Sequence, residues 1–311
     1  MFITVHRQVP KVTAIIPTLC ARERAEHLRR AISSLKGSST DAIAILLVVN
    51  GPRFDPELLS EMRSRPDVAV EQLAEASAAL AQLHGRKCLR TEFFCFLDDD
   101  DEYLPGATDA RLTALESRTD CDFVVTNGFK TNGTDHDRVI YERLNEVPRD
   151  PLGALLVENW MSSCGALFRT SSIPASFFDD PVDYIEWTWL AFKLAMANKR
   201  PCVLTEPTFR IYLTSDSASQ SEPYMLTHTE LFKRMLAMNA RADVNRILKA
   251  RLCESWHNIS SYYRHRGSMR KAWSAHLNSL RHPAGWKYVA YTRRLFLPPL
   301  LLSSLRNIHL S

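Results

Sequence analysis

The chain has 311 residues, is 45% hydrophobic and carries a formal net charge of +4. It is long enough to bury the core of one large domain or two modest ones, which excludes a small domain that needs disulfides or metals to fold. Its seven cysteines include no C-x-x-C pair, so the pattern fits neither a disulfide framework nor a zinc site and indicates a reducing compartment.

The sequence shows no targeting or membrane-spanning segment. Arg7, Gln8 and Lys11 interrupt the apolar residues of the N-terminal stretch, which does not have the layout of a signal peptide. No apolar run reaches the roughly 18 residues of a membrane span. We therefore expect a cytoplasmic protein that could also bind the cytoplasmic face of the inner membrane.

Short runs rich in Val, Ile and Phe alternate with stretches of helical periodicity through the first half of the chain. The predicted strands are 12–17, 42–50, 68–73, 93–98 and 122–127, and the predicted helices between them are 24–36, 55–65, 74–90 and 105–118. This alternation predicts an α/β fold with a Rossmann-like, mainly parallel sheet that helices cover on both faces. Ligands of such sheets bind outside the carboxyl ends of the strands.

A run of four carboxylates, Asp98 to Asp101, follows the predicted strand 93–98 at this edge. A favourable helix dipole accounts for one or two such residues but not for Asp98 and Asp99. Mg²⁺ and Mn²⁺ prefer carboxylate and phosphate oxygens as ligands. Because the chain has neither G-x-x-x-x-G-K nor G-x-G-x-x-G, the run predicts a nucleoside diphosphate bound through a divalent metal.

The second half of the chain changes from an α/β pattern to a helical one. Residues 130–160 are polar and loop-like; 163–169 and 201–213 are predicted to be extended; 183–197, 224–241, 243–266 and 268–281 are predicted to be helical. We expect an α/β catalytic domain over 1–220 and a helical region over 221–311.

Asp183 and Glu186 are candidates for a catalytic base. They lie three residues apart, on one face of the predicted helix 183–197, with Trp187 and Trp189 alongside. A carboxylate within hydrogen-bond reach of a hydroxyl group makes that hydroxyl a better nucleophile. Asp183 has the alternative role of a helix cap.

The stretches "AIIPT", "ILLVVNGP", "TEFFCFLDDDDEYLPG" and "SSCGALFRTSSIPASFFDDPVDYIEWTWLAFKLA" together resemble family 2 glycosyltransferases of the GT-A fold, over roughly residues 11–215. The resemblance is to bacterial-type enzymes of polysaccharide and lipopolysaccharide biosynthesis. It implies an inverting transferase that moves a sugar from a nucleotide-diphospho-sugar, with a UDP-sugar as the first choice, to a glycan or lipid-linked acceptor.

The resemblance also implies a donor site. This site consists of Pro17, Thr18, Arg24, Asn50, Asp98 and Asp99, with the metal (Mn²⁺ or Mg²⁺) on Asp100 and Asp98. Asn50 stands where the family often has an Asp that reads the base, which leaves the identity of the base open. Gly85 matches a glycine that allows its helix to approach the sheet.

On the acceptor side, the resemblance implies that Glu186 is the base. The implied acceptor contacts are Trp160, Ser162, Ser163 and Trp187. Aromatic faces stack on sugars and hydroxyl groups bind them, although Trp160 fits a core position equally well.

Three features depart from the family pattern. Gln82 and Leu83 replace an Arg-Asn pair, Trp187 replaces a second acid after Glu186, and Arg210 or Thr214 stands in for a family His. Two alternatives therefore remain: a sugar nucleotidyltransferase, which the absence of glycine from "PTLCARER" disfavours, and a non-catalytic sugar-binding protein that retains the fold.

The end of the chain is basic. Residues 255–311 contain nine Lys and Arg, no Asp or Glu, and several interleaved aromatic residues. This pattern predicts peripheral contact with an anionic membrane surface. A solvated helical face, packing on the catalytic domain and a homo-oligomer contact are the alternatives. Because RRM, KH and zinc patterns are missing, we expect no nucleic acid partner.

Overall fold

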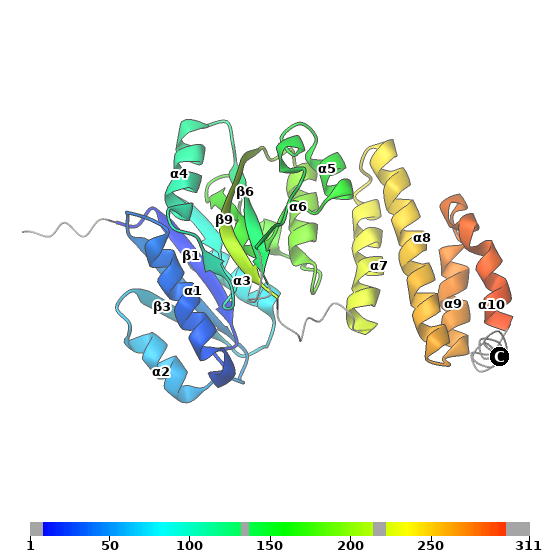
Figure 1. The fold of residues 1–311 in the computed structure, drawn as a ribbon, viewed down its shortest axis with the longest axis horizontal. Coiled ribbons are helices and arrows are strands. Elements are labelled where there is room, and N and C mark those ends of the chain that lie inside the picture. Colours follow the sequence, from blue (N-terminus) through cyan, green and yellow to red (C-terminus); the bar gives the residue numbers. More distant parts are fainter. Residues whose placement is uncertain (1–8, 132–136, 214–221, 297–311) are drawn as a thin grey trace, which may run out of the picture. The chain divides into compact units, whose positions relative to one another are not determined.

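The computed structural model describes residues 9–131, 137–213 and 222–296 (Figure 1). The chain divides into two compact units, Met1–Pro181 with Glu186–Asp216, and Val182–Ile185 with Ser217–Ser311. Each unit is described by itself. Thr214 and the tail beyond residue 296 lie outside the described residues.

The first unit contains a mixed sheet whose strands, within the described residues, have the order β3-β2-β1-β4-β8-β6-β9-β5, with β7 paired to β6. The strands are β1 Val12–Thr18, β2 Ile43–Asn50, β3 Val68–Leu73, β4 Phe93–Phe96, β5 Glu102–Tyr103, β6 Phe123–Thr131, β7 Arg138–Val139, β8 Ala166–Arg169 and β9 Pro201–Tyr212. Strands β1 to β4 pair in parallel, and β8 runs antiparallel between β4 and β6. The predicted α/β fold with a mainly parallel sheet is therefore confirmed.

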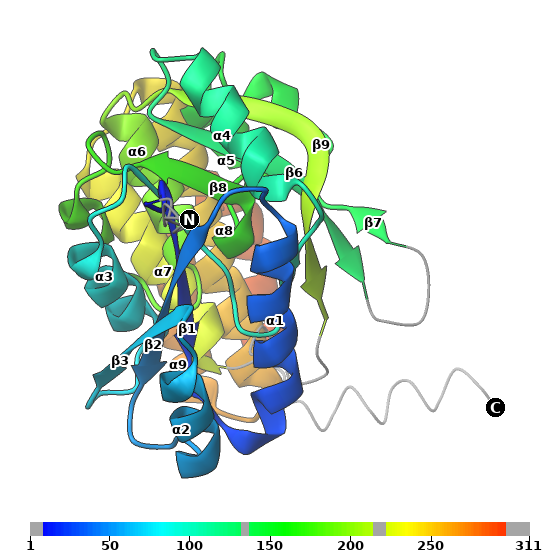
Figure 2. The same cartoon turned by 90° about the vertical axis from the view of Figure 1, so that its left-hand side faces the viewer.

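The helices of this unit flank the sheet. They are α1 Ala25–Gly37, α2 Pro56–Ser64, α3 Ala78–Cys88, α4 Ala107–Ser117, α5 Pro151–Val157 and α6 Glu186–Met196. Figure 2 shows α1 and α3 on opposite sides of β1. Covered in this way, β1 and β4 are buried on both faces, which explains why their sequences are continuous apolar runs.

Local capping explains where several helices begin. Asp55 accepts a hydrogen bond from the Leu58 amide (2.8 Å) and Pro56 follows it, so α2 begins at its predicted position. The same device, with Asp150 and Pro151, starts α5 inside the segment predicted to be loop-like, and that prediction was wrong there. Helix α4 begins at Ala107 rather than Pro105, after Gly106 in a left-handed conformation (φ 72°).

The second unit is mainly helical over its described residues from Glu222 onward. It contains α7 Glu222–Ala237, α8 Ala242–His265, α9 Met269–Ser279, a 3₁₀ segment Pro283–Tyr291 and α10 Thr292–Phe296. Its core is formed by Ile259, Tyr263, Ala272, Ala275 and Leu295. None of the described helices combines the length and the apolar character needed to cross a bilayer.

Candidate active site

The acidic run lies at the carboxyl end of β4, next to the end of β1. Thr18, the last residue of β1, donates a hydrogen bond to Asp99 Oδ2 (2.6 Å). Arg24, in the turn before α1, lies 3.0 Å from Asp99 Oδ1 and also pairs with the Asp100 carboxylate. The structure therefore brings together four of the predicted donor-site residues, which lie at the ends of two neighbouring parallel strands or in the turns that follow them.

Two other carboxylates of the run face the segment before β8. Ser163 donates a hydrogen bond to Asp98, and the Cys164 thiol donates one to Asp101 (3.0 Å). One ligand atom each from Asp98, Asp101 and Cys164 lie within 4.8 Å of one another. Asp98 is thus next to Asp101, whereas the carboxylate of Asp100, its predicted partner on the metal, is paired with Arg24.

Burial and mutual repulsion perturb these carboxylates. Burial, followed by the charge of Asp101, raises the pKa of Asp98 well above its usual value. Burial also raises the pKa of Asp99, and it raises the pKa of Asp101 to about 7. A raised pKa means that the negative form is disfavoured, here mainly because burial removes these carboxylates from water.

A divalent cation fits this donor set. Clustered carboxylate oxygens are ligands that Mg²⁺ and Mn²⁺ prefer, and a bound cation relieves the repulsion among them. Burial raises the pKa of the Cys164 thiol well above its usual value, so this side chain stays neutral and is a poor ligand for such hard ions. The carboxylates of the run would therefore hold the metal.

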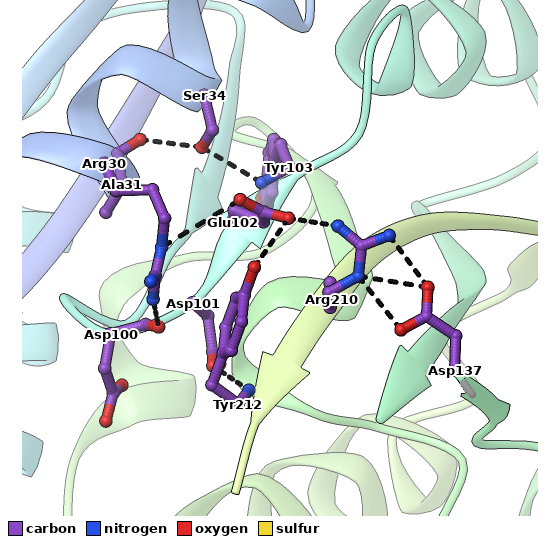
Figure 3. A network of polar contacts seen from close by, with 10 residues as sticks. All are labelled: Arg30, Ala31, Ser34, Asp100, Asp101, Glu102, Tyr103, Asp137, Arg210 and Tyr212. Carbon is purple, nitrogen blue, oxygen red and sulfur yellow. Dashed lines mark hydrogen bonds and ion pairs between the residues drawn. The ribbon is translucent and has the colours of Figure 1, made fainter. Parts of the chain in front are cut away.

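A network of charged side chains supports the turn that follows the run (Figure 3). Arg30 donates to the backbone oxygen of Asp100, and its guanidinium lies over the Tyr212 ring (3.9 Å). The Tyr212 amide donates to Asp101 Oδ1 (3.1 Å), and the Tyr212 hydroxyl donates to Glu102 (3.0 Å). These contacts hold the Asp101 and Glu102 carboxylates in fixed orientations.

Arg210 belongs to the same network. Its guanidinium pairs with Glu102 and, at 2.8 Å, with Asp137. These two carboxylates raise the pKa of Arg210, so the group stays positively charged. Arg210 therefore pairs with neighbouring acids, and its expected place in the position of the family His stays a prediction.

The predicted acceptor residues separate into two groups. Trp160 is 1% exposed, its indole N–H donates to the Pro151 carbonyl (3.0 Å), and its ring stacks on Phe123. A ring with both faces covered cannot stack on a sugar, so we correct the prediction and treat Trp160 as a core residue. Ser162 is partly buried, while Ser163 is committed to Asp98.

The candidate bases lie at the start of α6. Glu186 is its first residue and is partly buried, whereas Asp183 is exposed in the segment before it. The Trp187 ring packs edge-on against Phe96, with 5.1 Å between the ring centroids. Because Phe96 ends β4 two residues before Asp98, this contact holds the first turn of α6 next to the strand that carries the acidic run.

The remaining predicted donor residues lie in the parallel part of the sheet. Pro17 is buried in β1, and Asn50, at 7% exposed, ends the neighbouring strand β2. Sequence reasoning missed Arg30, Cys164 and Tyr212. The position of Cys164, next to the predicted site residue Ser163, could have indicated it. Nothing in the sequence distinguishes Arg30 and Tyr212, which hold the acidic run in place, from surface residues of the same types.

Comparisons with known proteins identify the family and the fold. The family model described as "Glycosyl transferase family 2" matches residues 13–173, more than half of the chain. A search of curated protein sequences gave no match.

Solved structures of two proteins illustrate the similarity in fold. S. aureus TarS, residues 1–349, is 15% identical, with a TM-score of 0.56 over 86% of this chain and 80% of that one. It has also been solved with UDP-GlcNAc (16% identity, TM-score 0.55, 85% and 79% covered). The mannosyltransferase PcManGT from Pyrobaculum calidifontis, in complex with GDP-Man and Mn²⁺, is 14% identical, with a TM-score of 0.55 over 93% of this chain and 81% of that one. At such identities the likeness extends to the fold.

Proposed function

The chain belongs to glycosyl transferase family 2, and from this we propose that it is a metal-assisted, inverting enzyme acting on a hydroxyl group of a glycan or lipid-linked acceptor. As a member of the family it is a glycosyltransferase (EC 2.4) that takes its sugar from a nucleotide-sugar donor. The metal, the stereochemistry and the acceptor are the proposed parts. The family match disfavours the alternative of a sugar nucleotidyltransferase.

One observation carries the proposal: the run Asp98–Asp101 is gathered at the carboxyl end of β4 beside Thr18, Arg24 and Ser163. This edge is where α/β sheets bind ligands. We propose that Asp98 and Asp100 hold Mn²⁺ or Mg²⁺, and that Ser163, which donates a hydrogen bond to Asp98, orients this carboxylate. When bound, the metal supplies positive charge that stabilises the leaving diphosphate.

The donor is proposed to be a UDP-sugar. S. aureus TarS has been solved with UDP and with UDP-GlcNAc, whereas the Pyrobaculum mannosyltransferase holds GDP-Man, so the fold accommodates either base. Pro17 and Thr18 would flank the base, since they end β1, the strand next to β4. Asn50, which ends β2 on the other side of β1, would read it. Arg24 brings the positive charge against which a diphosphate would lie, and Asp99 would bind the ribose.

In the proposed reaction Glu186 accepts the proton of the acceptor hydroxyl, and Asp183 is the alternative base. The acceptor oxygen attacks the anomeric carbon and forms the glycosidic bond. The bond from that carbon to the β-phosphate oxygen breaks, and the nucleoside diphosphate leaves with the electron pair. Attack opposite the leaving group inverts the anomeric centre. Trp187, partly buried next to Glu186, is proposed to contact the acceptor sugar.

The basic C-terminal region is proposed to place the enzyme near a lipid-linked acceptor. In its described part, Leu277, Trp286, Val289 and Phe296 are 52 to 73% exposed. Lys287, Arg293 and Arg294 are exposed beside them in the sequence. Exposed aromatic residues interleaved with cations are typical of proteins that bind anionic bilayer surfaces.

A thermal-shift panel of UDP-, GDP-, dTDP- and CMP-sugars, with and without Mn²⁺, tests the donor site. A ligand at 100 times its Kd stabilises the native state by about 2.7 kcal/mol. We expect one nucleotide class to raise the melting temperature only with Mn²⁺, and D98N and D100N to lose this shift. D120N removes an exposed carboxylate elsewhere and is the matched control.

The outcomes separate the alternatives. A shift that is equal with and without Mn²⁺, or that survives in D98N and D100N, would contradict the proposed metal site. A Mn²⁺-dependent shift without sugar transfer to any glycan or lipid-linked acceptor would favour the non-catalytic binding protein. Product stereochemistry, read from the anomeric proton coupling, tests inversion independently.

A further inference from the structure

A second group of metal-ligand side chains lies between β3 and α3, and none of its members belongs to the carboxylate site. Glu71 comes from β3, and His84 and Cys88 come from α3. His84 Nε2 is 3.3 Å from Glu71 Oε2 and 3.4 Å from Cys88 Sγ. The three ligand atoms all lie within 4.8 Å of one another.

The fold places these residues together by regular secondary structure. His84 and Cys88 are four residues apart on α3, so their side chains point from the same face of the helix. In the described sheet β3 is the edge strand, and Glu71 pairs with Val48 of β2, a strand that α3 also contacts. The group therefore depends on helix periodicity and strand register, and not on a loop.

The distances fit a tetrahedral metal. Zinc with Zn–N and Zn–O distances near 2.0 Å and a Zn–S distance near 2.3 Å separates its N and O ligands by about 3.3 Å and its S and N ligands by about 3.5 Å. The observed values are 3.3 and 3.4 Å. The first is longer than the roughly 2.7–3.2 Å of an ordinary N–H···O bond. We propose that Glu71, His84 and Cys88 bind Zn²⁺, with the fourth position taken by water.

The chemistry of the three ligands separates this site from the acidic run. Thiolate and imidazole select Zn²⁺ over Mg²⁺ and Mn²⁺, which prefer the all-oxygen set of Asp98–Asp101. The sequence showed no zinc pattern because the usual sign is a C-x-x-C pair, whereas here one ligand comes from a different element.

The site is accessible from solvent. Cys88 is exposed, while the other six cysteines are buried. Zinc takes the thiolate as its ligand, so binding releases the proton of the thiol.

A metal here would fasten α3 to the edge of the sheet. Helix α3 packs closely on β1, since Gly85 lies against Ile15, and its Arg86 donates to the Ile173 carbonyl (2.7 Å). Zinc binding to the native state alone would thus stabilise the first unit.

Thiol labelling of the reduced, chelator-treated full-length protein tests the site. Because Cys88 is the exposed thiol, we expect one fast-reacting cysteine with Ellman's reagent, which C88S removes. One equivalent of Zn²⁺ should suppress this fast phase, whereas Mn²⁺ should not. H84A and E71Q should each weaken the protection by at least about tenfold. H265A, which removes an exposed histidine from α8, should leave it unchanged.

Two results would overturn the proposal. Either Zn²⁺ leaves the labelling rate of Cys88 unchanged in the wild-type protein, or H84A and E71Q protect Cys88 as well as the wild type does. Replacing Zn²⁺ with Co²⁺ gives a second readout, since a Cys88 thiolate ligand adds a sulfur-to-cobalt charge-transfer band that C88S must lack. Neither measurement uses a sugar donor, so its outcome is independent of the proposed transferase reaction.

Discussion

At the scale of single residues, the chemistry of the proposed reaction requires a carboxylate that accepts the proton of the acceptor. Glu186 and Asp183 are both acids near the start of α6, but their surroundings differ. Glu186 is partly buried and precedes Trp187, which packs on Phe96, whereas Asp183 is exposed. A general base must lie within hydrogen-bond reach of the acceptor hydroxyl, and a partly buried carboxylate excludes competing water better.

We therefore expect E186Q to lower kcat by about 10²–10⁴-fold, the usual contribution of a general base. D183N, the matched control, should keep most of its activity. Glutamine retains the size of the side chain, so donor-induced thermal shifts should be unchanged in both variants. Steady-state kinetics with the donor found in the thermal-shift panel measure the effect. A large loss in D183N and a small one in E186Q would reverse the assignment.

At the scale of elements, the approach of α3 to the sheet depends on Gly85. A Cβ atom at this position would lie 2.5 Å from Ile15 Cγ2 and 3.4 Å from Val48 Cγ2, which confirms the prediction that a glycine lets this helix approach. Ile15 is fully buried in β1, so it has little room to move.

We expect G85A to lower the free energy of unfolding by about 1–3 kcal/mol, because overpacking forces neighbouring side chains out of place. G37A is the matched control: this glycine is also helical, as the last residue of α1, and a Cβ atom there would meet nothing within 4 Å. Alanine there should be neutral or stabilising by up to about 1 kcal/mol. Urea unfolding of both variants measures the difference. Equal stability of G85A and G37A would mean that α3 shifts at little cost.

The elements themselves were largely predictable, and the reasons are physical. Strands β1 and β4 are continuous apolar runs and α1 has strong apolar periodicity, and local sequence reports both directly. The 3₁₀ turn at Ser163–Gly165 and the contact of Cys164 with Asp101 depend instead on the antiparallel insertion of β8 between β4 and β6. Such long-range pairing leaves no local pattern. The same applies to Trp160, because a tryptophan side chain suits a sugar-stacking position and a core position equally well.

In the helical unit, two histidines make stability depend on pH. His276 is fully buried and its Nε2 lies 2.8 Å from the Thr292 hydroxyl; His257 stacks on Tyr288 with 4.0 Å between the ring centroids. Burial lowers the pKa of both histidines. The nearby charges of His276, Lys287 and Arg294 lower the pKa of His257 further, whereas the charge of Glu254 raises it. Below the unfolded-state pKa of about 6.5 the unfolded chain binds more protons, so this stability is lost as pH falls.

We expect the free energy of unfolding of the wild type to fall relative to that of H276Q between pH 7 and pH 5. Glutamine cannot gain a charge, so the variant should lose less stability on acidification even if it is weaker at pH 7. The measurement compares the unfolding free energies of the two proteins at each pH. This comparison is needed because the carboxylates of the acidic run have raised pKa values, which make the folded state more stable as the pH falls, in both proteins alike. H265Q, an exposed histidine of α8, is the control. Parallel pH curves for wild type and H276Q would contradict the prediction.

At the scale of the whole molecule, the uneven distribution of charge bears on where the enzyme works. All acidic residues precede residue 255, and nine cations follow. The described end of the chain also exposes Trp286 (65%) and Phe296 (73%), which is unusual for aromatic residues that face water alone. An anionic bilayer satisfies both features, because lipid headgroups attract the cations and the interface accepts the rings.

We expect the full-length protein to float with vesicles that contain phosphatidylglycerol and not with phosphatidylcholine vesicles, and to be released by salt as charges are screened. Each cation near the surface contributes about 1 kcal/mol. Replacing Trp286 and Phe296 by serine should reduce flotation, whereas V139S, which removes an exposed apolar residue from β7, should not. Point variants are preferable to truncation after residue 254, because that cut falls inside α8 and removes most of the core of the helical unit. Undiminished flotation of the Trp286 and Phe296 variant would show that this surface does not dock on the bilayer, and salt-resistant binding would exclude the charge-based part of the argument.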